Sequence, residues 1–144
     1  MTLSGVGAGS KAGSSTDKSN GAPKNKELPE QILKRFDAQD LPYAYCPVGW
    51  LDLVIELDTK LNELVPYYKI RQIKEKFAGL RYYVDVPLYK DGSTRTQAHD
   101  LISKYEEMSY SICDICGGAG KEVNLTGWMA TRCEGHDTKE KAEN

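Results

Sequence analysis

Three cysteines and one histidine near the C-terminus carry the clearest chemical pattern in the chain. Cys113 and Cys116 are separated by two residues, sixteen residues follow, and Cys133 and His136 are again separated by two. Two intervening residues let a tight turn direct both side chains at one point, so two such pairs complete a tetrahedron. Three thiolates and one imidazole suit Zn²⁺ by softness and coordination number, although Fe²⁺ could occupy the same ligands in an overexpressed sample. We therefore predict a zinc ion held by these four side chains.

The same pattern favours a structural zinc site over a catalytic one. A catalytic zinc commonly has three protein ligands and an open position for water, whereas four protein ligands close the shell here. The zinc-deaminase pattern needs a proline before its Cys-x-x-Cys, and Cys113 has none. With His136 assigned to the metal, only His99 is left for acid–base chemistry. The alternative is a set of unligated cysteines with a surface histidine. Cys46 stands outside the pattern in either case.

A second group of interest is a run of basic residues interleaved with aromatic ones. The run comprises Lys69, Arg71, Lys74, Lys76 and Arg81. Lys74, Lys76 and Arg81 are the candidate partner-binding residues of the run, together with Trp128 in the later segment between the two ligand pairs. Such a run could offer cations to phosphates and rings to stacked bases. It could equally form a protein-binding surface, or a solvated strand face whose tyrosines pack into the core. Trp128 could cap a small zinc core or stand exposed at an interface.

Composition narrows the function classes. The chain has 144 residues, a net charge of −2 and a pI near 5.7, so it lacks the overall positive charge that supplies non-specific binding to nucleic acid. No apolar run approaches the length of about 20 residues that spans a bilayer. The first residues also lack the basic and apolar regions of a secretory signal. We expect a cytoplasmic protein without a membrane partner.

Hydrophobic periodicity predicts the helices. Residues 1–27 are rich in glycine and serine and are expected to form a disordered tail. A short helix is expected to begin near residue 28, and apolar residues at three- and four-residue intervals predict an amphipathic helix over 49–65. Ser93 or Thr94 is expected to cap a third helix. Its apolar stripe comprises Ala98, Leu101, Ile102, Tyr105 and Met108.

Alternating apolar and polar residues predict the strands. One strand is expected at 68–71 and another at 80–86, joined through residues 73–79 with a turn near Ala78-Gly79. A shorter hairpin between the ligand pairs is expected to turn near Thr126-Gly127. The expected fold is α+β: amphipathic helices packed on a small antiparallel β-hairpin or sheet, with a C-terminal zinc-ribbon or treble-clef-like unit.

The expected organisation along the chain follows from these elements. The boundaries are a tail at 1–27, an α+β core at 28–110, a zinc-binding unit at 111–138 packed on the core, and a flexible C-terminus at 139–144. Zinc would supply stability that so small a core lacks.

The order of motifs in residues 49–136 resembles that of small uncharacterised proteins found in bacteriophages and prophages. The matching segments are Gly49-Trp50, the stretch KEKFAGLRY at 74–82, and the set Cys113, Cys116, Cys133 and His136. Ala78 replaces a glycine of the Gly-Gly form. This resemblance implies a zinc-binding phage protein and brings no established activity.

Phage accessory proteins of this size often act by binding. The resemblance therefore implies a non-enzymatic protein, in the host cytoplasm, that binds and modulates or inhibits a host macromolecular complex such as a defence system. The partner would be a host protein or protein complex, contacted through the basic aromatic hairpin or through Trp128. The alternative is a nucleic-acid-binding zinc module that acts through the basic hairpin. A nuclease or nucleotide-processing enzyme is the third and least favoured hypothesis.

Overall fold

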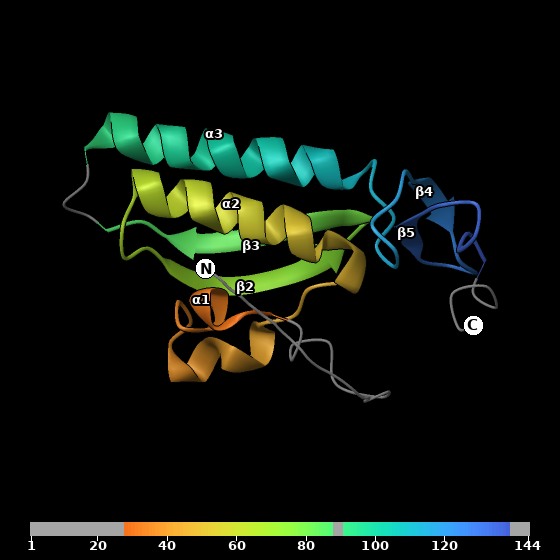
Figure 1. Ribbon diagram of the computed structural model, residues 1–144, viewed down its shortest axis with the longest axis horizontal. Coiled ribbons are helices and arrows are strands. Elements are labelled where there is room, and N and C mark those ends of the chain that lie inside the picture. Colours follow the sequence, from red (N-terminus) through yellow and green to blue (C-terminus); the bar gives the residue numbers. More distant parts are fainter. Residues whose placement is uncertain (1–27, 88–90, 139–144) are drawn as a thin grey trace, which may run out of the picture.

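A two-stranded antiparallel sheet lies at the centre of the fold (Figure 1). The computed structural model describes residues 28–87 and 91–138. Strand β2 (Lys69–Lys76) pairs with β3 (Gly79–Asp85). Helix α2 (Leu51–Leu64) packs beside α3 (Gly92–Ser109), and α3 also packs on β3.

Shorter elements complete the described chain. Helix α1 (Glu30–Leu33) and the 3₁₀ helix η3 (Ala38–Tyr43) lie beside β2, at the edge of the sheet away from β3 (Figure 1). The 3₁₀ turn η4 (Val48–Trp50) leads directly into α2. A second two-stranded sheet, β4 (Lys121–Asn124) with β5 (Met129–Arg132), follows α3. The expected α+β class, with helices and small antiparallel sheets, is confirmed.

Neither edge of the central sheet is left open. A two-stranded sheet is marginal alone in water, and its unpaired N–H and C=O groups invite other strands. The Ile70 N–H of β2 donates to the Arg35 carbonyl at 3.0 Å. The Leu80 N–H of β3 donates to Ser109 Oγ of α3 at 2.8 Å. The sheet is therefore stabilised by its neighbours on both sides.

A buried carboxylate of the core, that of Asp58, joins three elements of the fold. Asp58 of α2 is almost fully buried and pairs with Arg35 Nε at 2.5 Å. The Tyr68 hydroxyl also donates to Asp58 and lies 2.6 Å from the Tyr82 hydroxyl. Because a buried carboxylate is costly unless it is paired and hydrogen-bonded, this network fixes α2 against the sheet and the segment after α1.

Several local expectations need correction. Strand β2 runs on to Lys76, and the turn is Phe77-Ala78, one residue earlier than predicted. The sequence did not predict this part of the strand, because Lys74, Glu75 and Lys76 lack the alternation of apolar and polar residues. Cross-strand pairing, rather than local hydrophobicity, extends the strand through them. Helix α3 is capped by Asp91, whose carboxylate accepts the Thr94 N–H at 2.8 Å. Met108, expected on the apolar stripe, is exposed.

Some expectations lie outside what the structure describes. The predicted tail at 1–27 and the predicted flexible C-terminus at 139–144 fall outside the described residues. The boundary at residue 110 stays a prediction. Among the helices that the structure describes, none has the length and apolar character needed to cross a membrane.

Candidate metal centre

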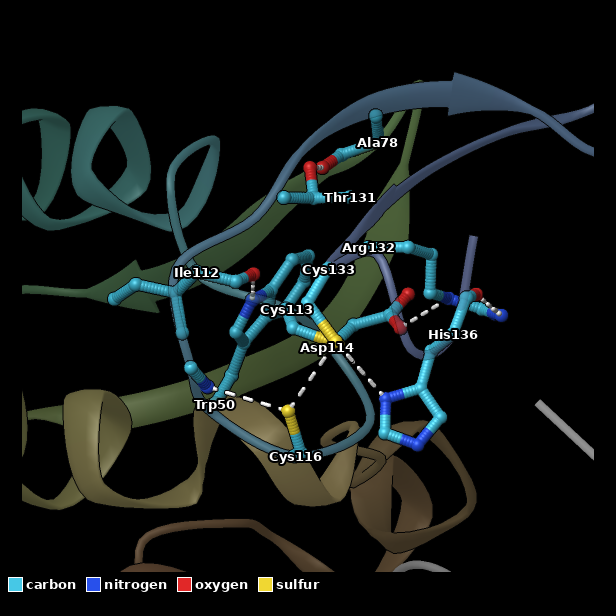
Figure 2. A network of polar contacts seen from close by, with 11 residues as sticks. Trp50, Ala78, Ile112, Cys113, Asp114, Cys116, Thr131, Arg132, Cys133 and His136 are labelled. Atoms are coloured by element: carbon cyan, nitrogen blue, oxygen red, sulfur yellow. Dashed lines mark hydrogen bonds and ion pairs between the residues drawn. The ribbon is translucent and has the colours of Figure 1, made fainter. Parts of the chain in front are cut away.

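The four predicted ligands come together in space (Figure 2). Their ligand atoms all lie within 4.8 Å of one another, and this cluster could hold a metal ion. Cys116 Sγ lies 3.7 Å from Cys133 Sγ, and His136 Nδ1 lies 3.6 Å from Cys113 Sγ and 3.2 Å from Cys133 Sγ. All three cysteines are free, and 3.7 Å is far beyond the length of a disulfide, about 2.05 Å.

A tight turn over residues 113–118, which we call the knuckle, presents the first pair. The Cys113 N–H donates to the Gly118 carbonyl at 2.7 Å, and the Gly117 N–H donates to the Cys113 carbonyl at 2.9 Å. Gly117 has φ +81°, a left-handed conformation that favours glycine. The Gly118 N–H reaches Cys116 Sγ at 3.4 Å. The glycines after Cys116 therefore let the backbone turn close to the sulfur atoms.

Backbone amides around Cys113 favour its thiolate. Burial opposes ionisation of this thiol, but N–H groups of Cys116, Cys133 and Ile115, with the His136 side chain, lower its pKa to about 6. The thiolate is the form that binds metals. The site is therefore arranged for a thiolate ligand.

The β4–β5 hairpin brings the second pair to the first. Its turn places Thr126 at φ 51° and Gly127 at φ 107°, as a two-residue type I′ turn requires, so the predicted turn is confirmed. Strand β5 ends at Arg132, and the next turn is closed by the His136 N–H donating to the Cys133 carbonyl at 3.0 Å. The hairpin thus bridges the sixteen residues between the pairs.

The knuckle docks on the start of α2. The Gly49 N–H donates to the Asp114 carbonyl at 3.0 Å, and Trp50 Nε1 donates to the Ile112 carbonyl at 2.8 Å. Trp50 is fully buried. A Cβ on Gly49 would lie 2.0 Å from the Cys113 carbonyl oxygen, well inside any allowed contact. Only glycine lets the two backbones approach this closely.

The β2–β3 turn is the second docking point. Thr131 of β5 is buried, and its hydroxyl donates to the Ala78 carbonyl at 2.6 Å (Figure 2). A Cβ on Gly79 would lie 2.3 Å from the Tyr110 ring, so a larger residue there would have to displace this ring. The candidate metal centre is therefore held between α2 and the central hairpin.

Gly49→Ala should separate the knuckle from the core. We expect a loss of at least about 2 kcal/mol in the free energy of unfolding, measured by urea denaturation, because the new methyl forces two backbones apart. Gly92→Ala is the matched control, since a Cβ there meets nothing within 4 Å. The control should be neutral or slightly stabilising. Equal effects of the two substitutions would contradict the proposed close approach.

An aromatic cavity of about 480 Å³ lies beside the metal centre. It is lined by Tyr45, Glu75, Phe77, Gly127, Trp128 and Met129. Trp128 is 46% exposed, and its ring centroid lies 5.7 Å from the Arg132 guanidinium carbon. The buried side chains of the hairpin are Leu125, Ala130, Thr131 and Arg132. The exposure of Trp128 agrees with the second of the two roles considered for it, and its place at an interface stays a prediction. Sequence reasoning missed Tyr45 and Glu75, because neither stands near Trp128 in the chain.

Two of the three predicted basic residues face away from this cavity, whereas Lys76 adjoins it, with Nζ 5.4 Å from the Phe77 ring centroid. Lys74 pairs across the sheet with Arg81, and neighbouring residues on a strand point to opposite faces, so both face away from the side that carries Glu75. Lys74 Nζ lies 5.8 Å from the Tyr83 ring centroid, and Arg81 bonds the Tyr110 hydroxyl at 3.3 Å. Lys76 is exposed beside the turn.

Acidic residues neutralise the rest of the basic run. Arg71 pairs with Asp40 at 3.4 Å and with Asp85 at 3.3 Å, and Lys69 pairs with Asp37 at 3.3 Å. These pairs weaken the case for a continuous phosphate-binding surface.

Glu75 belongs to a buried carboxyl pair. Burial, a hydrogen bond to Asp114 and the negative charge of Asp114 together raise the pKa of Glu75 to about 8, and Arg132 opposes this rise. Arg132 Nε is paired with Asp114 Oδ1 at 2.5 Å. Near neutral pH Glu75 is therefore protonated.

Glu75 should make stability fall with rising pH. In the unfolded chain this carboxyl ionises near its ordinary pKa of 4.5, and in the folded chain near 8. Between these values the folded state holds one more proton, so the free energy of unfolding should decrease by up to about 1.4 kcal/mol per pH unit.

Glu75→Gln should abolish this contribution, since the amide keeps the shape and does not titrate. Urea denaturation of both proteins between about pH 5.5 and pH 8, with metal present throughout, measures the difference, because other titrating groups cancel. Parallel stability curves would show that Glu75 ionises normally.

Two other sequence candidates lie elsewhere. Cys46 is buried, donates to the Pro47 carbonyl at 3.3 Å and does not belong to the metal cluster, and burial raises its pKa to about 12. His99 is exposed on α3.

Searches against protein families, curated proteins and solved structures give no match for this chain.

Proposed function

We propose that this protein is a binding module that recognises a partner protein through its aromatic cavity and holds that cavity in shape with a structural zinc ion. One observation carries the proposal. Tyr45, Phe77 and Trp128 come from three separate segments, and their exposed rings line one cavity. Phe77 is 69% exposed at the tip of its turn, so its ring contributes little to folding. Exposed aromatic side chains gathered around a cavity are typical of interaction sites.

The ligand geometry supports zinc. With zinc–sulfur bonds of about 2.3 Å and zinc–nitrogen bonds of about 2.0 Å, a tetrahedron places two sulfurs about 3.8 Å apart and a sulfur about 3.5 Å from a nitrogen. The Sγ–Sγ distance of 3.7 Å between Cys116 and Cys133 and the distances of 3.6 Å and 3.2 Å from His136 Nδ1 to Cys113 and Cys133 Sγ lie within about 0.3 Å of these values. A knuckle, a hairpin and a second ligand pair also support a zinc-ribbon or treble-clef-like unit. Four protein ligands leave no open position for a substrate.

Metal analysis tests the structural zinc. We expect one zinc per chain by inductively coupled plasma mass spectrometry, and loss of cooperative unfolding in the 111–138 unit after chelation, because metal binding supplies folding free energy. Cys116→Ser should lose the metal, whereas Cys46→Ala should retain it despite its buried position. A metal-free chain that folds with unchanged stability would contradict the site, and one iron per chain would change the metal assigned.

The identity of the partner is proposed from the resemblance to phage proteins. A phage accessory protein that binds a host protein or complex, such as a defence system, needs a preformed surface and no catalytic group. The aromatic cavity supports this function better than the nucleic-acid alternative, because a carboxyl group, that of Glu75, lines it and Lys74 and Arg81 face the other way. The chain's net charge of −2 agrees with this preference.

Two sets of substitutions distinguish the functions. Phe77→Ala with Trp128→Ala should abolish capture of one specific bacterial protein, identified by mass spectrometry, because the rings would be lost from its interface. Joint replacement of Lys74, Lys76 and Arg81 by alanine is the control and should leave that capture within about threefold.

The opposite pattern would overturn the protein-binding function. It would consist of duplex DNA binding that is measured by fluorescence anisotropy, falls steeply with salt and is lost only in the basic triple variant.

A further inference from the structure

Two of the four candidate metal ligands lie close together where small solutes can reach them. Cys116 is exposed and Cys133 is partly exposed, and their Sγ atoms lie 3.7 Å apart (Figure 2). Cys116 lines a cavity of about 420 Å³ that the exposed Met108 also lines, and Cys133 lines a second cavity of about 550 Å³. Both cysteines therefore border space that a small oxidant can enter.

The other two cysteines are protected. Cys113 is fully buried, and its N–H and carbonyl groups are both hydrogen-bonded within the knuckle. Cys46 is also buried and lies outside the metal cluster. Accessibility therefore favours Cys116 as the first cysteine that an oxidant attacks, with Cys133 as its nearby partner.

A bound zinc ion would keep both accessible sulfurs reactive. Zinc binds cysteine as the thiolate, and the thiolate is also the form that attacks an oxidant. Thiolate character and exposure together decide which cysteines of a protein are oxidised. Cys116 has the exposure, and zinc would supply the thiolate.

We propose that Cys116 and Cys133 are a site of oxidative modification, at which a hydroperoxide converts the two thiolates to a disulfide and the zinc ion is released. This inference rests on the structural zinc of the proposed function and adds a means of controlling it. The chemical class of the substrate is a hydroperoxide, and hydrogen peroxide is its smallest member.

The reaction balances with hydrogen peroxide as the oxidant. The Cys116 thiolate attacks one peroxide oxygen, the O–O bond breaks, and a sulfenic acid and a hydroxide form. The Cys133 thiolate then attacks the Cys116 sulfur, forms the S–S bond and expels the sulfenic oxygen as a second hydroxide. Two electrons pass from the two sulfurs to the peroxide, and the hydroxides take protons from solvent. Zinc keeps its charge and is left with Cys113 and His136, too few ligands for its four-coordinate site.

The positions of the two sulfurs suit this bond. They must approach from 3.7 Å to about 2.05 Å, which rotation of the two side chains can supply. Cys116 belongs to the knuckle and Cys133 follows β5, so the disulfide would join the same two segments that zinc joins. A Cys113–Cys116 disulfide is the competing product, and it would have to close within the hydrogen-bonded turn of the knuckle.

Peroxide treatment of the zinc-loaded full chain tests the inference. Zinc release is followed with a chromogenic chelator, and we expect about one zinc released for every two thiols lost. The remaining thiols are then blocked with N-ethylmaleimide in denaturant, and the chain is digested with trypsin. Dithiothreitol with added zinc should restore the bound metal, because a disulfide is reducible whereas higher oxidation states of cysteine are not.

Peptide mapping identifies the disulfide. Trypsin separates residues 105–121, which contain Cys113 and Cys116, from residues 133–139, which contain Cys133. The expected product joins these two peptides through Cys116 and carries N-ethylmaleimide on Cys113. We expect it to exceed all disulfides that contain Cys113 by at least about fivefold, because Cys113 is the buried member of the cluster.

Two variants that keep all four ligands serve as controls. Cys46→Ala removes the fourth thiol of the chain, and Met108→Leu removes the thioether that shares a cavity with Cys116. Both should release zinc within about twofold of the rate of the unmodified protein, because neither residue takes part in the reaction. Loss of zinc release in Cys46→Ala would assign the oxidation to Cys46 and overturn the inference. Peptide mapping of the unmodified protein requires no variant.

Failure of this inference can be told apart from failure of the proposed function. Zinc that stays bound while Met108 is oxidised, a disulfide between Cys113 and Cys116, or release without any disulfide would overturn the inference and leave the structural zinc standing. A folded chain that binds no metal would instead contradict the structural zinc, and the inference would fall with it. Capture of a partner protein is measured on the untreated chain and does not depend on either result.

Discussion

The approach of two backbones at Gly49 is the constraint on which the rest of the structure depends. The Gly49 N–H bonds the Asp114 carbonyl at 3.0 Å, and no side chain fits between this residue and Cys113. The next residue, Trp50, is fully buried and bonds Ile112 at 2.8 Å. A metal that fixes the knuckle would therefore also fix the start of α2, because the two share hydrogen bonds. Stability gained at the metal centre passes in this way to the helical core.

Two contacts to backbone carbonyls bring the separate motifs of the sequence, at 49–50, 74–82 and 113–136, together in the fold. Gly49-Trp50 receives the knuckle from one side, and the β2–β3 turn receives β5 from another through the hydrogen bond from Thr131 to Ala78. The Phe77-Ala78 turn has φ 53° and 73°, as a type I′ turn requires, although neither residue is glycine. Residues 74–82 and the metal ligands thus belong to one assembly. Its shape follows from backbone contacts that the chain order does not reveal.

Local patterns in the sequence were enough to predict the two long helices, the second hairpin and the grouping of the candidate metal ligands. The period of α2, the turn at Thr126-Gly127 and the ligand spacing each depend on residues close in the chain. Glu75 could not be found in this way, since it lies between lysines and reads as part of a solvated strand. Its partner Asp114 comes from the knuckle, and only the docked structure places the two together. The prediction that Met108 belongs to the buried stripe was wrong, because the helical period gives the positions of apolar residues but not how far the neighbouring elements extend over them.

The exposed rings are best understood by asking what folding requires of them. A non-glycine residue in the left-handed region lowers the stability of the fold by about 1 kcal/mol. Phe77 has this conformation, with φ 53°, and its ring is 69% exposed. Glycine or asparagine would build the same turn more easily. Trp128 likewise remains 46% exposed beside a turn that Gly127 already makes possible. Both rings line one cavity, and the proposed recognition of another molecule would account for their exposure.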